Sequence, residues 1–304
     1  MIHIGDCIEL MQKMESDSVN TCVTSPPYFG LRDYGRDGQI GLEDTPAEFV
    51  SKLVEVFAEV YRLLRDDGTL WLNLGDSYAG YHGNKNAGYD EAPSNKGGYF
   101  ENQRASTVGK DGLKNKDLIG IPWRVAFALQ DAGWYLRQEI IWHKPNPTPE
   151  SVTDRCTKAH EHIFLLSKSP RYYFDHEAIK EPAKNSAQPS VGRGGFNGKT
   201  NAMPGREAFR AVVEMRNRRS VWSVPTRAFK GAHFATFPEQ LIEPCILAGS
   251  PAGGVVLDPF MGAGTTAVVA EKLGRRWTGC ELNPEYAALA MNRIRGTQVN
   301  LLGI

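Results

Sequence analysis

The order of apolar runs and amphipathic stretches along this chain predicts an α/β protein. Short apolar runs bounded by turn residues, a pattern typical of buried strands, occur at residues 19–23, 69–74, 135–142 and 255–260. Between the first two lies a long amphipathic stretch whose apolar residues fall on one helical face, opened by the capping box Thr45-Pro46-Ala47-Glu48. Alternating elements of this kind favour a mainly parallel sheet with helices on both faces.

Weaker patterns predict the remaining elements. Asp6 can cap a short helix that runs through Met14, and a further helix is expected between Pro122 and Gly133. Residues 162–166 and 171–174 are expected to form a hairpin across the Ser169-Pro170 turn.

Two polar regions interrupt this pattern. Residues 77–117 are rich in Gly, Asn and Lys with interspersed aromatic residues, which predicts a mobile loop rather than a core element. Residues 183–220 carry eight Lys or Arg against two Glu, a local excess of six positive charges. Such a segment is either a solvated insert or a surface that tracks phosphates and reads bases.

A glycine loop near the C-terminus predicts a ligand site. The strand at 255–260 leads into Met261-Gly262-Ala263-Gly264, a helix follows, and the next strand ends in Glu281. Glycines allow close approach of the backbone, and an acidic residue about twenty positions later is expected to bind ribose hydroxyls. The loop also fits a dinucleotide fingerprint, so a nicotinamide-dependent dehydrogenase and a purely structural turn are alternatives. Too little chain follows Glu281 for a second mononucleotide-binding half.

The pentapeptide Thr24-Ser25-Pro26-Pro27-Tyr28 closes the first predicted strand. Two prolines stiffen the backbone at the strand end, where a hydroxyl, a carbonyl and an aromatic ring are then held together. This set can accept hydrogen bonds from an amino group and stack on a flat ring; the alternative is a proline turn that only ends the strand.

Together the two segments resemble the DNA amino-methyltransferases. Thr24 to Tyr28 is similar to their catalytic motif, and residues 258–266 are similar to their cofactor motif. The order, catalytic motif first, resembles the circularly permuted beta class, and residues 5–7, 142–147 and 233–238 also resemble family segments.

The resemblance implies a fold and a division of the chain. The fold is a Rossmann-like S-adenosylmethionine-dependent methyltransferase fold, circularly permuted, with a mixed, mainly parallel sheet and an inserted target recognition region. Residues 1–150 would form the catalytic part, 151–232 the hairpin and recognition region, and 233–304 the cofactor-binding part.

The resemblance also implies roles for named residues. The catalytic set is Ser25, Pro26, Pro27 and Tyr28: the Ser25 hydroxyl and the Pro26 carbonyl would accept from the exocyclic amine, and Tyr28 would stack on a flipped base. No metal is expected. The residues implied for S-adenosylmethionine are Asp6, Thr24, His233, Thr236, Asp258, Pro259, Phe260, Gly262, Gly264, Thr265, Thr266 and Glu281. Those implied for DNA are Lys144, Arg193, Arg216, Arg218 and Arg219. Alternative roles are a helix cap for Asp6, a helix start for Thr236 and a place beside a proline turn for Lys144.

The predicted function is a site-specific DNA methyltransferase acting on an exocyclic amine. Ser25, in place of Asp or Asn, and the following residues 30–34 resemble the cytosine-N4 enzymes, with adenine N6 as the alternative. A non-catalytic DNA-binding module is the competing class. Double-stranded DNA is the predicted partner; a cognate restriction endonuclease and a second copy of the chain are left open.

Composition agrees with this prediction. A chain of 304 residues can bury a full α/β core and carry a smaller lobe, and no apolar run approaches a membrane span. The start lacks a secretory leader, and five scattered cysteines without metal-ligand spacing indicate reduced thiols. We therefore expect a protein of the cytoplasm of a prokaryotic or phage-infected cell. The formal net charge is zero, so a DNA surface must come from uneven charge distribution.

Overall fold

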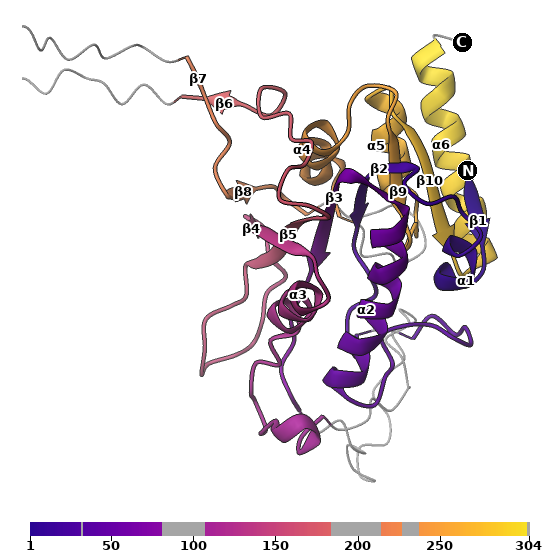
Figure 1. Cartoon of the computed structure of the whole chain (residues 1–304). Coiled ribbons are helices and arrows are strands. Elements are labelled where there is room, and N and C mark those ends of the chain that lie inside the picture. Colours follow the sequence, from indigo (N-terminus) through magenta and orange to yellow (C-terminus); the bar gives the residue numbers. More distant parts are fainter. Residues whose placement is uncertain (32, 81–106, 184–213, 227–236, 303–304) are drawn as a thin grey trace, which may run out of the picture.

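An eight-stranded sheet organises the computed structural model, which describes residues 1–31, 33–80, 107–183, 214–226 and 237–302 (Figure 1). The strand order is β1-β10-β9-β2-β3-β5-β4-β8. The strands are β1 (Ile2–Ile4), β2 (Val19–Thr24), β3 (Leu64–Leu74), β4 (Tyr135–His143), β5 (His160–Ser167), β8 (Val221–Ser223), β9 (Val255–Asp258) and β10 (Arg276–Glu281).

All strands of this sheet except β5 run in the same direction. β1, β10, β9, β2 and β3 pair in parallel, β5 is antiparallel to both β3 and β4, and β8 is parallel to β4. The carboxyl ends of the parallel strands therefore meet the beginning of β5 at one edge of the sheet. In open α/β sheets this edge is where ligands bind.

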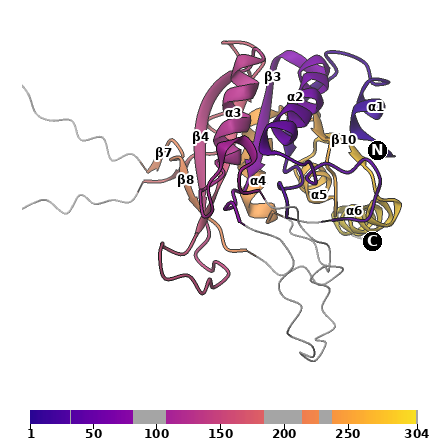
Figure 2. The ribbon, with the colours of Figure 1, turned by 90° about the horizontal axis from the view of Figure 1, so that it is seen from below.

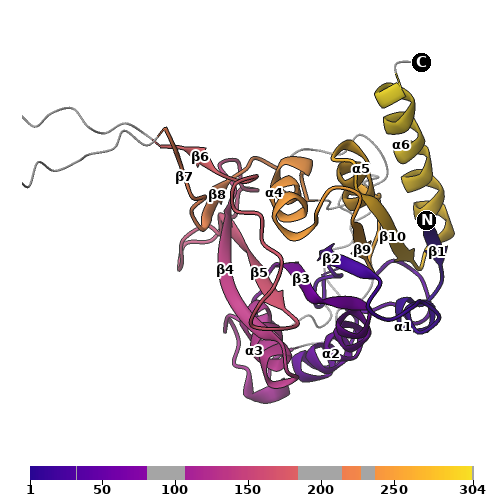
Figure 3. The ribbon, with the colours of Figure 1, turned by 45° about the horizontal axis from the view of Figure 1, so that its top comes forward.

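Helices cover both faces of the sheet (Figure 3). One face carries α1 (Cys7–Met11), α2 (Pro46–Leu63) and α3 (Ile121–Asp131), and the other carries α4 (Glu239–Gly249), α5 (Thr265–Lys272) and α6 (Pro284–Leu302). A short 3-10 turn, η1, spans Lys110–Gly112. The strands β6 (Glu181–Pro182) and β7 (Met215–Arg216) pair as a separate small ribbon (Figure 1). Seen from below, β7 and β8 lie at the same side of the molecule (Figure 2). No helix of the described residues combines the length and apolar character that crossing a membrane requires.

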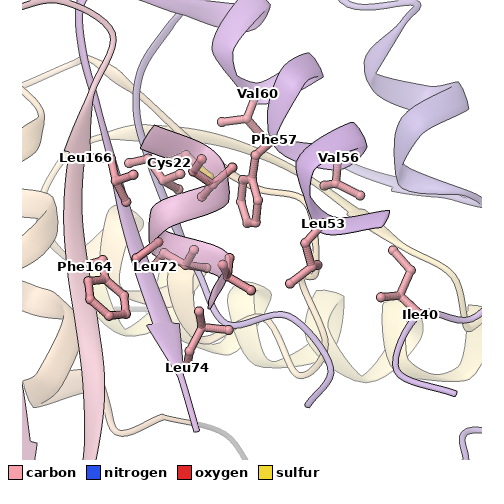
Figure 4. Close-up of a cluster of buried hydrophobic side chains, with 14 of the residues drawn as sticks. Cys22, Ile40, Leu53, Val56, Phe57, Val60, Leu72, Leu74, Phe164 and Leu166 are labelled. Atoms are coloured by element: carbon pink, nitrogen blue, oxygen red, sulfur yellow. The ribbon is translucent and has the colours of Figure 1, made fainter. Parts of the chain in front are cut away.

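The helix α2 forms as its sequence predicts. Thr45 and Glu48 complete the capping box, and Pro46 occupies the first turn. The apolar side chains of its inner face, among them Leu53 and Phe57, are fully buried in the hydrophobic core (Figure 4). These contacts fix α2 and the strands behind the catalytic pentapeptide.

The predicted hairpin is wrong. Residues 162–166 do form a strand, but β5 pairs with β3 and β4, and residues 171–174 form no strand. The apolar run of β5 lies between the strands β3 and β4. The turn residues Ser169 and Pro170 carry no information about which strands pair with β5. The small strand β1 and the helix α4 were not predicted. The division at residues 150 and 232 stays a prediction, although β5 and β8 both belong to the central sheet.

The ends of the predicted mobile loop belong to the core. Ala79 and Leu113 are buried in the hydrophobic cluster under α2, and Tyr78 forms a β-bridge with Leu118. The expectation that residues 77–117 lie outside the core is therefore wrong for these two ends, and residues 81–106 lie outside the described part.

Candidate active site

A pocket of about 360 Å³ lies at the edge where the parallel strands end. It is lined from the N-terminal part of the chain by Asp6 and by Ser25, Pro26, Pro27 and Tyr28, and from the C-terminal part by residues 258–263, Thr265 and Glu281. The predicted catalytic and cofactor segments therefore share one cavity. This follows from the pairing of β2 with β9 and of β1 with β10.

The catalytic pentapeptide is held by a polar network. The Tyr28 hydroxyl donates to Glu161 Oε2 at 2.6 Å and accepts from Asn73 Nδ2 at 2.8 Å. Asn73 Nδ2 also lies 3.0 Å from Glu161 Oε2 and 3.4 Å from Ser25 Oγ. Burial, with the adjacent Glu161 carboxylate, raises the pKa of Tyr28 well above its usual value of 10. Tyr28 is therefore neutral and fixed in orientation.

The Tyr28 ring packs directly against the backbone of Gly75. A Cβ atom at Gly75 would lie 2.4 Å from Tyr28 Cε2, too close for any real side chain. Gly75 follows β3 directly, so the end of this strand forms one wall for the ring.

Lys144 lies inside the pocket. Its Nζ forms an ion pair with Glu161 Oε1 and lies 4.4 Å from the centre of the Trp142 ring. Only 19% of the Lys144 side chain and 13% of the Glu161 side chain are exposed. A buried pair of this kind holds both side chains in place.

Asp258 joins the catalytic and cofactor segments. Its carboxylate is 2% exposed and accepts hydrogen bonds from Thr24 Oγ1 at 2.6 Å, Thr266 Oγ1 at 2.7 Å and the Phe260 amide at 3.0 Å. Burial raises its pKa from 3.8 to about 6, against the opposing effect of these three donors. Thr24, Thr266 and the carboxylate of Asp258 thus hold the pocket walls together, while their predicted cofactor contacts stay predictions.

Glu281 has the position expected of a ribose-binding carboxylate. It lines the pocket, and its oxygens accept from the amides of Gly262 and Asn283, each at 2.8 Å. Burial raises its pKa, opposed by these hydrogen bonds. A carboxylate offers about four acceptor positions, so the backbone amides leave acceptor capacity for ligand hydroxyls.

The glycine loop has room for a ligand. Gly262 has a φ of 50°, and a Cβ built there meets nothing closer than 3.9 Å, which leaves its surroundings open. At Gly264 the constraint differs: a Cβ would lie 2.8 Å from the Cβ of Ala290, so this glycine allows α5 to pack on α6. The residues present therefore fit a nucleoside held by Glu281 above a glycine loop.

Other predicted residues have mixed outcomes. Asp6 caps α1, accepting from the Ile8 and Glu9 amides, and also lines the pocket, so both of its roles remain compatible. Thr265 lines the pocket and accepts from Arg293 at 3.3 Å. His233, Thr236 and Arg193 lie outside the described residues.

Two of the three described arginines of the basic segment share one carboxylate. Arg216 and Arg219 both pair with Glu181, at 2.9 and 2.8 Å. Arg218 lies over the Trp222 ring at 4.7 Å, and its Nε has no hydrogen-bond partner among the described residues. None of the three lines the pocket, so any DNA contact they make lies outside it.

Sequence reasoning missed several pocket residues. Asn73 and Glu161 hold the catalytic segment, and Arg36, Asn283 and Tyr286 line the cofactor side. Asn73 carries a weak signal in the sequence, as an amide within the apolar run at 69–74. Glu161 precedes an apolar run, where a charged residue is unremarkable.

Comparison with known proteins agrees with this geometry. A family model for DNA methylases, covering N6 and N4 enzymes, matches residues 19–292. The chain is 50% identical over 303 residues to the type II methyltransferase M.Cfr9I of Citrobacter freundii, covering 99% of this chain and 89% of that protein. It is 48% identical to M.SmaI of Serratia marcescens, covering 96% and 90% of the two chains.

Solved structures share the fold. The PvuII DNA methyltransferase (cytosine-N4-specific) aligns with a TM-score of 0.62 at 19% identity, covering 96% of this chain and 85% of that one. A Thermus thermophilus protein described as a putative DNA modification methylase, in complex with S-adenosyl-L-methionine, aligns with a TM-score of 0.60 at 26% identity, covering 97% and 93%.

These matches confirm the predicted fold and enzyme class and exclude the dehydrogenase alternative. The mixed, mainly parallel sheet with helices on both faces is that of the α/β methyltransferases. The chain belongs to the N6 and N4 DNA methylase family and is an S-adenosylmethionine-dependent DNA methyltransferase.

Proposed function

We propose that this enzyme methylates N4 of cytosine at a specific sequence in double-stranded DNA. One observation carries the proposal: Ser25 of the catalytic motif lines the same pocket as the cofactor motif and Glu281. A target base at the first and a methyl donor at the second would then lie side by side. Serine at position 25, and its resemblance to the cytosine-N4 enzymes, favours cytosine over adenine.

The chain's own residues supply orientation. The Ser25 hydroxyl and the Pro26 carbonyl accept the two amine hydrogens, so the nitrogen lone pair turns towards the reacting methyl group. Tyr28, fixed by Glu161 and Asn73, stacks on the flipped base. S-adenosylmethionine, held beside Glu281 and the glycine loop, would supply an activated methyl group to this nitrogen, and the proton displaced from the amine would pass to water. Catalysis by positioning of this kind needs no covalent base adduct.

The cysteines of the pocket are not suited to covalent chemistry. Burial raises the pKa of Cys7 and of Cys280 to about 12, so both remain thiols at neutral pH. Cys22 is fully buried in β2, as its strand position predicts. Direct transfer to the amine is the mechanism that remains.

The proposed cofactor contacts are six residues of the implied set that line the pocket. Glu281 would bind the ribose hydroxyls, Gly262 would let the backbone approach, and Phe260 and Pro259 would contact the adenine or methionine portion. Asp6 and Thr265 would bind the polar ends of the ligand. Lys144, Arg193, Arg216, Arg218 and Arg219 stay predicted DNA contacts.

We further propose a role in a restriction-modification system. The relatives M.Cfr9I and M.SmaI are type II methyltransferases, and the chain spans 89% and 90% of them. A cognate endonuclease, a homodimer and a cytoplasmic location remain predictions.

One experiment tests the base. DNA is treated with the purified protein and S-adenosylmethionine, and its nucleosides are separated and identified by mass spectrometry. N4-methylcytosine is expected; N6-methyladenine would replace the cytosine assignment. A titration with S-adenosylmethionine, run alongside, checks that the purified protein binds the cofactor. Sequencing of the modified DNA then identifies the site.

A further inference from the structure

Resting on the proposed function, we infer that Lys144 binds the target base itself and not only the DNA backbone. Its ammonium group donates a hydrogen bond to the ring nitrogen that neighbours the amino-bearing carbon. Glu161 is the positioning residue that holds Lys144 and Tyr28 in place for this contact.

The location of Lys144 is the first argument. Its side chain is mostly buried within the pocket that Ser25 also lines, beside Trp142 and Glu161. A lysine that only tracks phosphates needs a long, solvated side chain on an outer surface. Here the charged end is held inward by an ion pair.

The hydrogen-bond inventory is the second argument. An ammonium group has three N–H donors, and Glu161 Oε1 is its hydrogen-bond acceptor among the described residues. Two donors therefore remain for a ligand, and a partly buried donor left without an acceptor costs free energy. Lys144 and Ser25 line the same pocket, and Glu161, the acceptor of Lys144, is linked to the catalytic segment through Asn73 Nδ2, which lies 3.0 Å from Glu161 Oε2 and 3.4 Å from Ser25 Oγ.

The chemistry of the base supplies the acceptor. In cytosine the ring nitrogen N3, and in adenine N1, is an acceptor next to the carbon that carries the amine. Guanine and thymine carry an N–H at the corresponding ring position. On the Watson–Crick edge, acceptors at Ser25 and Pro26 for the amine and a donor at Lys144 for the adjoining ring nitrogen match cytosine and adenine, and not guanine N1–H with O6 or thymine N3–H with O4.

The ion pair explains how a cation can sit there. Positive charge develops on the exocyclic nitrogen during methyl transfer, and an isolated ammonium group would oppose it. Glu161 offsets that charge while accepting from the Tyr28 hydroxyl at 2.6 Å. One carboxylate thus fixes the stacking ring and the base-binding cation together.

A double-mutant cycle between enzyme and substrate tests the contact. The enzymes are the full-length wild type and Lys144→Met. The matched control is Lys272→Met, because Lys272 on α5 is also a lysine paired with a glutamate, Glu239, but is exposed. The substrates are DNA duplexes that contain the recognition site identified by sequencing. The target position carries either cytosine or 3-deazacytosine, which lacks the ring acceptor. Single-turnover methylation rates are measured, and binding of S-adenosylmethionine checks that each variant is folded.

For each enzyme, the rate on cytosine is divided by the rate on 3-deazacytosine. This ratio is expected to be about tenfold to a hundredfold larger for wild type and for Lys272→Met than for Lys144→Met. Lys144→Met should itself be slowed on cytosine by a similar factor. The intrinsic effect of the deaza ring cancels because both enzymes experience it. Losses that simply multiply would overturn the inference and return Lys144 to the DNA backbone.

Glu161→Gln separates positioning from contact. It keeps a hydrogen-bond acceptor for Tyr28 but removes the charge that holds Lys144, so its rate on cytosine should fall while part of the deaza discrimination survives. A Glu161→Gln enzyme with wild-type rate on cytosine would remove Glu161 from the positioning role. If wild type produces no methylcytosine at all, the proposed function fails; if it does and the cycle is multiplicative, only this inference fails.

Discussion

The hydroxyl of Thr24 donates to the carboxylate of Asp258 at 2.6 Å, across 234 positions of sequence. Thr24 precedes the catalytic serine directly, and Asp258 opens the cofactor segment. The Thr266 hydroxyl contacts the same carboxylate from the start of α5. The base-binding and cofactor-binding walls are therefore fixed to each other by one buried acidic side chain.

This carboxylate should make stability depend on pH. The folded pKa of Asp258, about 6, exceeds its usual 3.8, so between these values the folded state binds more protons than the unfolded state. The free energy of unfolding contributed by this group is then greatest below pH 4 and falls as pH rises towards 6. Relative to Asp258→Asn, the wild type should lose about 2.4 kcal/mol between pH 4 and 7, measured by denaturant unfolding at each pH. The exposed Asp66→Asn serves as the control, and a flat difference for Asp258→Asn would contradict the raised pKa.

Ser25→Ala should slow methyl transfer by about a hundredfold and leave S-adenosylmethionine binding nearly unchanged, because the hydroxyl contacts the base and not the cofactor. Single-turnover rates and calorimetric titration measure the two effects. Ser51→Ala, on the exposed side of α2, is the control. Unchanged turnover of Ser25→Ala would remove this serine from the mechanism.

Gly75→Ala should also slow transfer selectively. The added methyl group would lie 2.4 Å from the Tyr28 ring, so the ring must move from its place beside Glu161. We expect a rate loss of roughly tenfold or more, by analogy with misplacement of a positioned group. Cofactor affinity should not change, and a variant with wild-type rate would show that the ring position is not critical.

Two substitutions test the cofactor wall. Glu281→Ala should weaken S-adenosylmethionine binding by roughly 1 to 3 kcal/mol through loss of charged hydrogen bonds. Gly262→Val should abolish binding, because a branched side chain fills the open space beside the loop. Calorimetry measures both, with circular dichroism to confirm folding. Wild-type affinity in a folded Glu281→Ala protein would refute the ribose assignment.

The basic segment is tested through salt. If Arg216, Arg218 and Arg219 each contact a phosphate, neutralising all three should flatten the slope of log K against log salt by up to about three. Glu181 pairs with two of them, so Glu181→Gln should strengthen DNA binding. Fluorescence anisotropy over a range of salt concentrations measures both effects. An unaltered slope in the triple variant would show that the DNA-binding surface lies elsewhere, and residues 77–117 would be the next candidate.

The limits of sequence reasoning follow from distance along the chain. Thr24 to Tyr28 and the Gly262 loop carry their chemistry in consecutive residues, so both were predictable. Glu161 and Asn73 acquire theirs only through the antiparallel register of β3 and β5, which pairs Asn73 with Ile163. The same non-local pairing explains why the predicted hairpin is wrong. The turn signal at Ser169-Pro170 is local, whereas the partners of β5 are the distant strands β3 and β4.

The pairing of β2 with β9 and of β1 with β10 has a consequence for synthesis on the ribosome. The strands β1 and β2 leave the ribosome long before the strands that pair with them are synthesised, because Thr21 pairs with Val256 and Ile2 pairs with Gly279. Until then one side of β2 is an open strand edge that can pair with another chain. A nascent polypeptide that already carries the catalytic pentapeptide therefore has no cofactor wall, and a product truncated before β9 would be a candidate for aggregation rather than a partial enzyme.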